Sequence, residues 1–563
     1  MTPREHEPTS IEELTPDREP TPTSGGKGRA AAGHGPPRPA DAPPSAFLSA
    51  AAVSFTRGLL MVLTLVSGML SAAYFGTSVS KDCYLVAQTL PLLLSTVLMS
   101  GVYGLVLVEL AEIAPNEGVA GQLRLVRRTL RQLGMVLIPL CLVATFFPRP
   151  FIALMAPGFR PELIELSGRL LPITMFTMVG TIGFAVLRAL FASRHRFALP
   201  GFINLLVAGI AILTLVILVG RLGIFAQALG QLLGTILATV VLGVAGYLLL
   251  KDPPGFVPQS HGPAPHHGRG LWRDFLPVGI GANFGQVNLL VDNAFASFLP
   301  AGNITRLGFA SVIFSNAEIL TIFSLAEVAF ARFTAADRRG TVALEDELGI
   351  NLRYMLLLAA PIAFGCLVFG EPLARLLFER GEFGPDSTAA VARILACLAP
   401  EIVFMGYFAC FWRILFARRR LWILVGASLG AMTLNATLNA LLMGPLGVSG
   451  IALSTSCVTA VFAVILGALV HREGLRVFGQ GDWSFILRVL AAAAIMGAAV
   501  FVWSLVFERA VDVGGEPARL SEIAGGLTLA ALVYSSALQL QGIRAIPDAL
   551  RRLCRVVIER RRS

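Results

Sequence analysis

The sequence predicts an all-α integral membrane protein of about fourteen transmembrane helices. Of its 563 residues, 55% are hydrophobic and only 14% are charged, whereas an ordinary soluble domain has roughly 25% charged residues. The apolar residues gather in stretches of roughly 20 or more, the length that a helix needs to cross a bilayer. Basic residues concentrate in alternate loops, a pattern typical of membrane topology.

The candidate spans follow one another along most of the chain. They lie at residues 47–75, 83–110, 132–148, 165–187, 198–219, 222–250, 274–300, 307–330, 354–371, 388–412, 421–443, 446–470, 485–507 and 520–541. Because their number is even, both termini should lie on the same side of the membrane. Loops after even-numbered spans carry most of the lysines and arginines, as at Arg127, Arg128 and Arg131, so that side should be the cytoplasm.

The formal charge of +10 is explained by this topology better than by a nucleic-acid partner. Residues 1–45 are rich in Pro, Thr, Gly and Glu, with no apolar core of a secretory signal, and should form a disordered cytoplasmic tail. Residues 542–563 should form a basic cytoplasmic tail. We therefore expect a multi-pass membrane protein with both termini in the cytoplasm.

The chain also resembles itself at a spacing of roughly 222–225 residues, as transporters built from two halves do. The similar segments are 150–161 and 372–385, 191–196 and 416–421, and 222–229 and 446–453. Six spans per half is an even number, so the halves should run in the same sense, as two parallel six-helix lobes around a central cavity. We expect lobes at 46–250 and 274–472, a linker at 251–273, and two additional spans at 473–541.

Two stretches resemble a known family over about residues 50–470. They are Tyr74-Phe75-Gly76-Thr77-Ser78 with Asp82, and Gly281-Ala282-Asn283 with Gln286, Asn288 and Asp292. The chain resembles the MurJ/MviN lipid II flippases of the multidrug/oligosaccharidyl-lipid/polysaccharide exporter superfamily. The resemblance implies a flippase that moves an undecaprenyl-linked glycan precursor, lipid II or a polysaccharide repeat unit, from the cytoplasmic to the periplasmic leaflet by alternating access. Such a flippase would lie in the bacterial cytoplasmic (inner) membrane, and peptidoglycan synthesis, cell wall biogenesis and cell shape would depend on it.

The family normally places arginines in the first, second and eighth spans, where a lipid pyrophosphate would bind. The matching positions in this chain are Met61, Ser67, Ser95, Thr96 and Val312. This is a large change, because arginine suits multidentate recognition of phosphate oxygens. Arg57 lies one helical turn before Met61 on the same face and is the candidate replacement. The alternative is that Arg57 extends to the cytoplasmic interface.

The residues expected to bind substrate share a polar side chain at the family-like positions or inside a span. They are Arg57, Asp82, Asn283, Gln286, Asn288 and Asp292. Asp82 could instead belong, with Lys81, to a solvated turn. The polar stripe of span seven could instead be a helix-packing seam.

Acidic side chains inside spans are candidates for coupling transport to a cation, namely Asp292, Glu318 and Glu327. We expect no metal and no cofactor other than Na⁺ or H⁺ as coupling ion, and the histidines of the linker should not bind metal. No nucleophile elbow, P-loop or HExxH motif occurs, so the chain should not be an enzyme.

Two other functions remain open at this stage. One is a cation-coupled small-molecule exporter of the same fold, and the other is a non-transporting scaffold of cell-envelope synthesis. The expected partners are a lipid-linked glycan, membrane lipids and other cell-envelope synthesis proteins.

Overall fold

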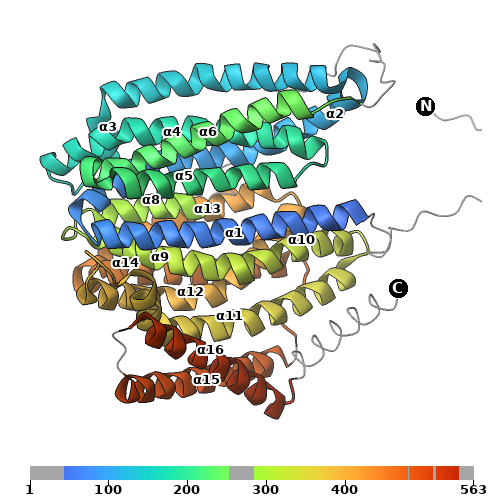
Figure 1. Cartoon of the computed structure of the whole chain (residues 1–563). Coiled ribbons are helices and arrows are strands. Elements are labelled where there is room, and N and C mark those ends of the chain that lie inside the picture. The colour runs from blue at the N-terminus through green and yellow to red at the C-terminus, as the bar shows by residue number, and fades with distance from the viewer. Residues whose placement is uncertain (1–43, 253–283, 480, 512–514, 544–563) are drawn as a thin grey trace, which may run out of the picture. The chain divides into compact units, whose positions relative to one another are not determined.

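A computed structural model describes residues 44–252, 284–479, 481–511 and 515–543 (Figure 1). The regular structure in these ranges is helical throughout. Residues Ser49–Ser563 form one compact unit, and the description below concerns this unit alone. The predicted N-terminal tail, most of the predicted linker and the basic C-terminal tail lie outside the described residues.

The N-terminal half contains six helices, one of them very long. They are α1 (Pro44–Phe75), α2 (Val79–Phe146), α3 (Pro148–Met155), α4 (Pro161–Ser193), α5 (Ala198–Leu222) and α6 (Ile224–Leu249). The prediction of a loop between spans two and three is wrong, because α2 covers both spans and the arginines between them are helical. The break is confined to Gly118, whose φ of 61° only glycine adopts readily.

The C-terminal half contains the remaining helices. They are α8 (Phe284–Ala296), α9 (Asn303–Glu318), the π-helix η2 (Ile319–Phe323), α10 (Ser324–Asp337), α11 (Thr341–Phe378), α12 (Pro385–Ala417), α13 (Leu421–Leu446), α14 (Val448–Arg472), α15 (Asp482–Ala510) and α16 (Glu516–Leu540). In the described residues, 12 helices are long and apolar enough to span a membrane. Helix α2 covers predicted spans two and three, and α8 lies within predicted span seven. With these two additions, the described helices match the fourteen predicted spans.

The internal repeat is visible in the backbone. Helices α4 and α12 both have 33 residues, and one constant offset in residue number relates their first and last residues. The same offset relates Gly223, with φ 54° and ψ −132°, to Gly447, with φ 59° and ψ −138°. It also relates His195 to Arg419, which share a left-handed φ of 57° that side chains rarely adopt. The two halves therefore repeat the same chain path in the same sense.

Equivalent helix pairs form the core of each half. In the N-terminal half α4 packs on α6 and α6 on α5, and in the C-terminal half α12 packs on α14 and α14 on α13. The last two helices, α15 and α16, pack against α11, as Figure 1 shows at the C-terminal end of the colour scale. Tyr534 of α16 donates a hydrogen bond to the Leu357 carbonyl of α11 at 2.9 Å.

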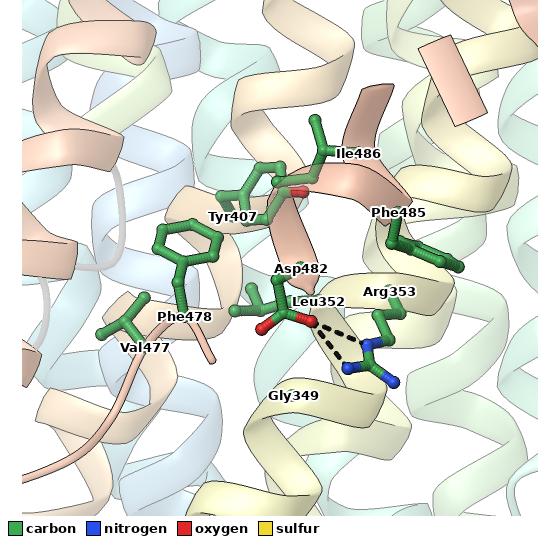
Figure 2. Close-up of a pocket in the computed structure, with 9 residues that line it drawn as sticks. All are labelled: Gly349, Leu352, Arg353, Tyr407, Val477, Phe478, Asp482, Phe485 and Ile486. Atoms are coloured by element: carbon green, nitrogen blue, oxygen red, sulfur yellow. Dashed lines mark hydrogen bonds and ion pairs between the residues drawn. The ribbon is translucent and has the colours of Figure 1, made fainter. Parts of the chain in front are cut away.

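A pocket of about 10 Å³ lies where α11, α12 and α15 meet (Figure 2). Its wall includes an ion pair in which Arg353 Nε and Nη2 lie 3.0 and 2.7 Å from Asp482 Oδ1. The Arg353 guanidinium also stands 5.6 Å from the centre of the Phe485 ring. A volume of this size holds about one water molecule. The contacts of Arg353 with Asp482 and Phe485 therefore hold α15 against α11. The pocket itself is too small for a substrate.

Candidate functional site

The two halves of the chain are joined by hydrogen bonds that concentrate at one end of the helices. We call this set the inter-half contact. It comprises Ala73, Thr77, Asp82, Thr89 and Gly158 from the N-terminal half, and Asn293, Ser297, Gly302, Thr305, Glu382 and Ser387 from the C-terminal half. Five of these eleven residues lie in the short turns between α1 and α2, α3 and α4, α8 and α9, and α11 and α12, and the other six lie in the helices that these turns join.

Asp82 is the centre of the inter-half contact and is only 3% exposed. Its carboxylate accepts hydrogen bonds from the backbone N–H of Gly302 and Thr305 and from the Thr305 hydroxyl, the last two at 2.8 and 2.6 Å. Gly302 is the N-cap of α9 and has no side chain with which to cap the helix. Asp82 therefore caps α9 from the opposite half, where a carboxylate also interacts favourably with the helix dipole.

The backbones of the two halves touch directly beside this cap. The Glu382 N–H donates to the Ala73 carbonyl at 3.0 Å. Gly76 and Gly381 both have positive φ, and a Cβ at either would overlap the carbonyl oxygen of Glu382 or Ala73. Glycine is therefore required at both positions for the halves to approach this closely.

At the opposite end of the helices, the arginines bind within their own half. Arg194 contacts Gln122 Oε1 at 2.7 Å and Asp252 Oδ1 at 3.1 Å. In the other half, Arg418 lies 3.3 Å from Asp337 and 3.9 Å from Glu473. Arg194 comes directly before His195, and Arg418 comes directly before Arg419, so the repeat places both networks at the same bend.

A buried polar cluster fills the interior of the C-terminal half. Asp292 of α8 is 7% exposed, and its two oxygens accept hydrogen bonds from Asn439 Nδ2 at 2.9 Å and Thr455 Oγ1 at 3.2 Å. Asn439 also donates to Asn435 Oδ1 at 3.1 Å. The carbonyl oxygen of the Asn439 side chain is buried without a hydrogen-bond partner in the described residues. The cluster therefore presents oxygen atoms that neutral donors satisfy only in part.

Two more acidic residues lie near this cluster. Glu401 of α12 is 5% exposed, interacts electrostatically with Asp292, and accepts a hydrogen bond from Thr459 Oγ1 at 3.1 Å. Glu318, the last residue of α9, interacts electrostatically with Glu401. The predicted set of Glu318 and Glu327 does not form a pair, because Glu327 is exposed on α10 and interacts with Arg413 of α12.

The interior of the N-terminal half contains a lysine. Lys81 is 5% exposed, and its Nζ donates to Ser71 Oγ at 2.7 Å and to Gln227 Oε1 at 2.9 Å. The Tyr84 ring faces the same ammonium, with its centre 4.9 Å away. The solvated-turn alternative is therefore wrong for both Lys81 and Asp82, because one binds α1 and α6 and the other binds α9.

Arg57 lies on an exposed face of α1, far from the inter-half contact. The neighbouring Thr56 is buried and lies against Gly201 of α5, so the helix is oriented with Arg57 pointing away from that packing. At ~1.5 Å per residue, Arg57 stands roughly 24 Å along α1 from Ala73. Ser95, at one of the family's arginine positions, is buried and donates its hydroxyl to the Pro91 carbonyl at 2.6 Å.

The remaining predicted site residues belong to the seventh span. Asn283 lies outside the described residues, and Gln286 is placed in α8 by its backbone alone. Asn288 is 5% exposed, and its Oδ1 is buried without a partner in the described chain. Among the residues that the structure describes, no group of three or more His, Cys, Asp or Glu side chains could hold a metal ion. The linker histidines fall outside those residues.

The sequence prediction missed several members of the C-terminal cluster. Glu401 stands inside an apolar span, the same signal that pointed to Glu318. Asn435 and Asn439 on α13, and Thr455 and Thr459 on α14, are spaced four residues apart and so share one helix face. Such spacing in two consecutive spans was the available signal for a polar partner of Asp292.

The family model described as "Lipid II flippase MurJ" matches residues 71–521. The chain belongs to the lipid II flippase MurJ family. The predicted resemblance is thus confirmed over most of the chain, including the interior clusters of both halves and the inter-half contact. This family consists of transporters and is not a family of catalytic enzymes.

Curated members of the family are distant relatives of this chain. The "probable lipid II flippase MurJ" of Buchnera aphidicola subsp. Acyrthosiphon pisum is 23% identical over 465 residues, covering 80% of this chain and 88% of the relative. That of Rhizobium meliloti is 28% identical over 462 residues, covering 77% and 82%.

Solved structures of the superfamily share the fold. A structure titled "Lipid II flippase MurJ, inward closed conformation" has a TM-score of 0.71 at 21% identity, over 87% of this chain and 99% of that chain. An inward-facing MATE family transporter of the MOP superfamily has a TM-score of 0.56 at 15% identity, over 74% and 94%. The predicted all-α multi-pass membrane fold is confirmed.

Proposed function

We propose that the chain is a flippase that moves an undecaprenyl-linked glycan precursor, with lipid II as the first cargo, from the cytoplasmic to the periplasmic leaflet. Membership of the lipid II flippase MurJ family over residues 71–521 is the observation that carries this proposal. The partners are then the lipid-linked glycan itself and the membrane lipids around it. A small-molecule exporter and a non-transporting scaffold are the outcomes that the experiments below would reveal instead.

The inter-half contact supports alternating access as the mechanism. Contacts between the halves gather at the end of the helices that holds Asp82 and Thr305, while Arg194 and Arg418 at the other end bind within their own halves. Breaking the contact and closing the other end would exchange the two sides. Transporters of two repeated halves work by such a movement of one half against the other.

The distribution of basic residues assigns the sides of the membrane in this proposal. The end with Arg194 and Arg418 is cytoplasmic by the excess of arginine, so the inter-half contact is periplasmic. Accessibility of single cysteines tests this assignment. Positions near Arg128, Arg339 and Arg419 should react from the cytoplasm, and positions near Pro161 and Pro385 from outside. Labelling of the last two only from the cytoplasm would reverse the orientation.

Arg57 is the proposed phosphate contact on entry from the cytoplasmic leaflet. It is exposed on α1, and the other arginine positions of the family are Met61, Ser67, Ser95, Thr96 and Val312 in this chain. Asp292 is the proposed site of coupling to Na⁺ or H⁺, since its carboxylate is buried beside a side-chain oxygen of Asn439 that lacks a partner. A buried carboxylate inside a membrane protein marks an ion or proton pathway by default.

Two experiments test the cargo. In cells depleted of their own flippase, expression of the chain should restore lipid II to the periplasmic leaflet, read by a leaflet-specific label. In proteoliposomes of the purified full-length chain, a fluorescent lipid II should become accessible from the opposite leaflet. Restored growth without flipping in proteoliposomes would favour the scaffold. Transport of organic cations without flipping would favour the exporter.

A further inference from the structure

Glu318 of α9 and Glu401 of α12 are two buried carboxyl groups on helices that pack against each other in the C-terminal half. Glu318 is 7% exposed and Glu401 is 5% exposed, and the two interact electrostatically. Glu401 accepts a hydrogen bond from the neutral Thr459 hydroxyl. Glu318 Oε1 is fully buried and has no hydrogen-bond partner in the described residues. Glu318 therefore has a buried carboxyl oxygen that lacks a hydrogen-bond donor among the described residues.

The other ionisable groups on the packed helices do not neutralise the pair. Asp292 of α8 adds a further negative charge that acts on Glu401. Asp82 of α2 binds the opposite end of α9, and Glu327 of α10 is associated with Arg413. Two like charges that share a buried site cannot both remain ionised without a large cost. A proton bound by either carboxyl removes the repulsion, and a protonated carboxyl can itself donate a hydrogen bond.

The position of Glu318 connects the pair to the inter-half contact. Glu318 ends α9, and the same helix begins at the Asp82 cap. Directly after Glu318 the chain forms the π-helix η2, in which the Ser324 hydroxyl bonds the Ile319 carbonyl at 2.8 Å. Single π-turns inside α-helices are frequent at functional sites. A change of charge at Glu318 therefore acts where α9 meets η2, and α9 is the helix that Asp82 joins to the N-terminal half.

The π-turn also packs on the helix of Glu401. Ile322 is fully buried, and its Cδ1 would lie 3.5 Å from a Cβ built at Gly406 of α12. Met355 of α11 would be closer still, at 3.1 Å from the same position. Because Gly406 has no side chain, α12 can pack closely against η2.

We propose that Glu318 and Glu401 form a proton-binding site that shares one proton in the present conformation and controls the inter-half contact through α9. On release, the proton passes to water and both carboxylates carry a charge. Repulsion then displaces Glu318, α9 shifts at η2, and the contact at Asp82 opens. The inference rests on the proposed function and deepens it by adding a proton site beside the proposed coupling residue Asp292, but the movement it describes needs no lipid substrate.

The direct test measures the distance between the halves as the pH changes. The purified full-length chain in nanodiscs, in Na⁺-free buffer and without lipid-linked glycan, carries spin-labelled non-canonical amino acids at Arg160 and Asp386. Both positions are exposed beside the inter-half contact, one in each half. In the wild type, raising the pH should lengthen the distance between the labels, because deprotonation opens the contact. Infrared absorption of protonated carboxyl groups should fall over the same pH range.

Substitutions decide whether the pair is responsible. Glu401→Gln cannot ionise and keeps an N–H donor, so the contact should stay closed at every pH and the infrared change should be lost. Glu318→Gln should do the same, and serves as the second variant if the first fails to fold. Glu327→Gln, which removes an exposed carboxyl from the same span, should keep the wild-type response.

A wild-type distance that does not depend on pH would overturn the inference. So would Glu401→Gln and Glu318→Gln proteins that both retain the wild-type pH response. A response that survives in a protein unable to flip lipid II would refute the proposed cargo and leave the proton site standing. Flipping of lipid II at a rate that does not depend on pH, in the wild type and in both variants, would refute the proton site and leave the proposed cargo standing.

Discussion

The N-terminal and C-terminal halves repeat the same chain path but have opposite charges inside. Helix α4 recurs as α12 with the same length of 33 residues, and His195 and Arg419 share the same left-handed backbone. Away from the inter-half contact, where Asp82 lies, the buried charged side chain of the N-terminal half is Lys81, whereas Asp292, Glu318 and Glu401 in the C-terminal half are acidic. The repeat thus determines the scaffold, and each half has acquired its own chemistry.

The equivalent positions make the difference concrete. The places that correspond to Glu401 and Glu318 are occupied in the other half by Thr177 and Leu94. Lys81 corresponds in turn to Thr305, and these two residues stand on opposite sides of the inter-half contact. The two halves therefore differ in the side chains that they bury, although they share one backbone path.

The largest expected effect tests what holds the halves together. Asp82→Ala removes the cap of α9, and each hydrogen bond to a charged group contributes roughly 1.5–3 kcal/mol. The loss of about 3 kcal/mol or more should shift the equilibrium toward an open contact by ~100-fold or more. Distances between labels at Arg160 and Asp386 measure the shift. Glu382→Ala is the control, because only its backbone N–H takes part.

The next effect concerns the acidic half. Asp292→Asn should abolish the dependence of flipping on the ion or pH gradient while expression stays normal, because the amide can neither bind a proton nor attract a cation. A coupling of about 1–3 kcal/mol corresponds to a stimulation on the order of 5–150-fold, which should fall to about one. Proteoliposome flipping with and without a gradient measures this. An unchanged gradient dependence would return Asp292 to the role of packing residue.

A smaller effect tests the basic half. Arg57→Ala should weaken substrate binding by about tenfold or more, since a charge-assisted contact to phosphate contributes roughly 1.5–3 kcal/mol. Arg57→Lys should restore only part of the affinity, because the planar two-pronged contact of guanidinium is lost. Titration of the purified protein with lipid II measures both. Normal binding by the alanine variant would leave Arg57 as a side chain that merely reaches the interface.

The smallest expected effect concerns Lys81. Lys81→Met removes a buried charge but leaves Ser71 Oγ within 3.1 Å of Gln227 Oε1, so these two groups can bond each other. Replacing buried charges by apolar groups of similar volume is often neutral or stabilising. The free energy of unfolding should therefore change by no more than about 1 kcal/mol, as thermal unfolding would measure. A loss of flipping at unchanged stability would give the basic half a second functional charge.

The fold was within reach of the sequence because its signals are local. Apolar stretches mark the spans, and short similar segments mark the repeat. The loop expected around Arg127 and Arg128 failed for a local reason too, since polar residues at a membrane surface can continue a helix. Gly118 is the one break in α2.

The site was less accessible because its contacts join distant parts of the chain. Asp82 and Thr305 are 223 residues apart, and Asp292 meets Asn439 across 147 residues. Hydropathy marks such residues as unusual but cannot pair them. The substrate and coupling roles of Arg57 and Asp292 stay predictions, and Glu401 was overlooked although it met the same criterion as Glu318.

The inter-half contact also sets how strongly a cargo must act. Among the described residues seven hydrogen bonds cross it, of which four join neutral groups and contribute roughly 0.5–1.5 kcal/mol each, and three go to the Asp82 carboxylate and contribute roughly 1.5–3 kcal/mol each. Moving a two-state protein from 1:99 to 99:1 takes about 5.5 kcal/mol of differential affinity. Under the proposed function, a cargo or ion that opens this contact must therefore bind the open state more tightly than the closed state by several kcal/mol.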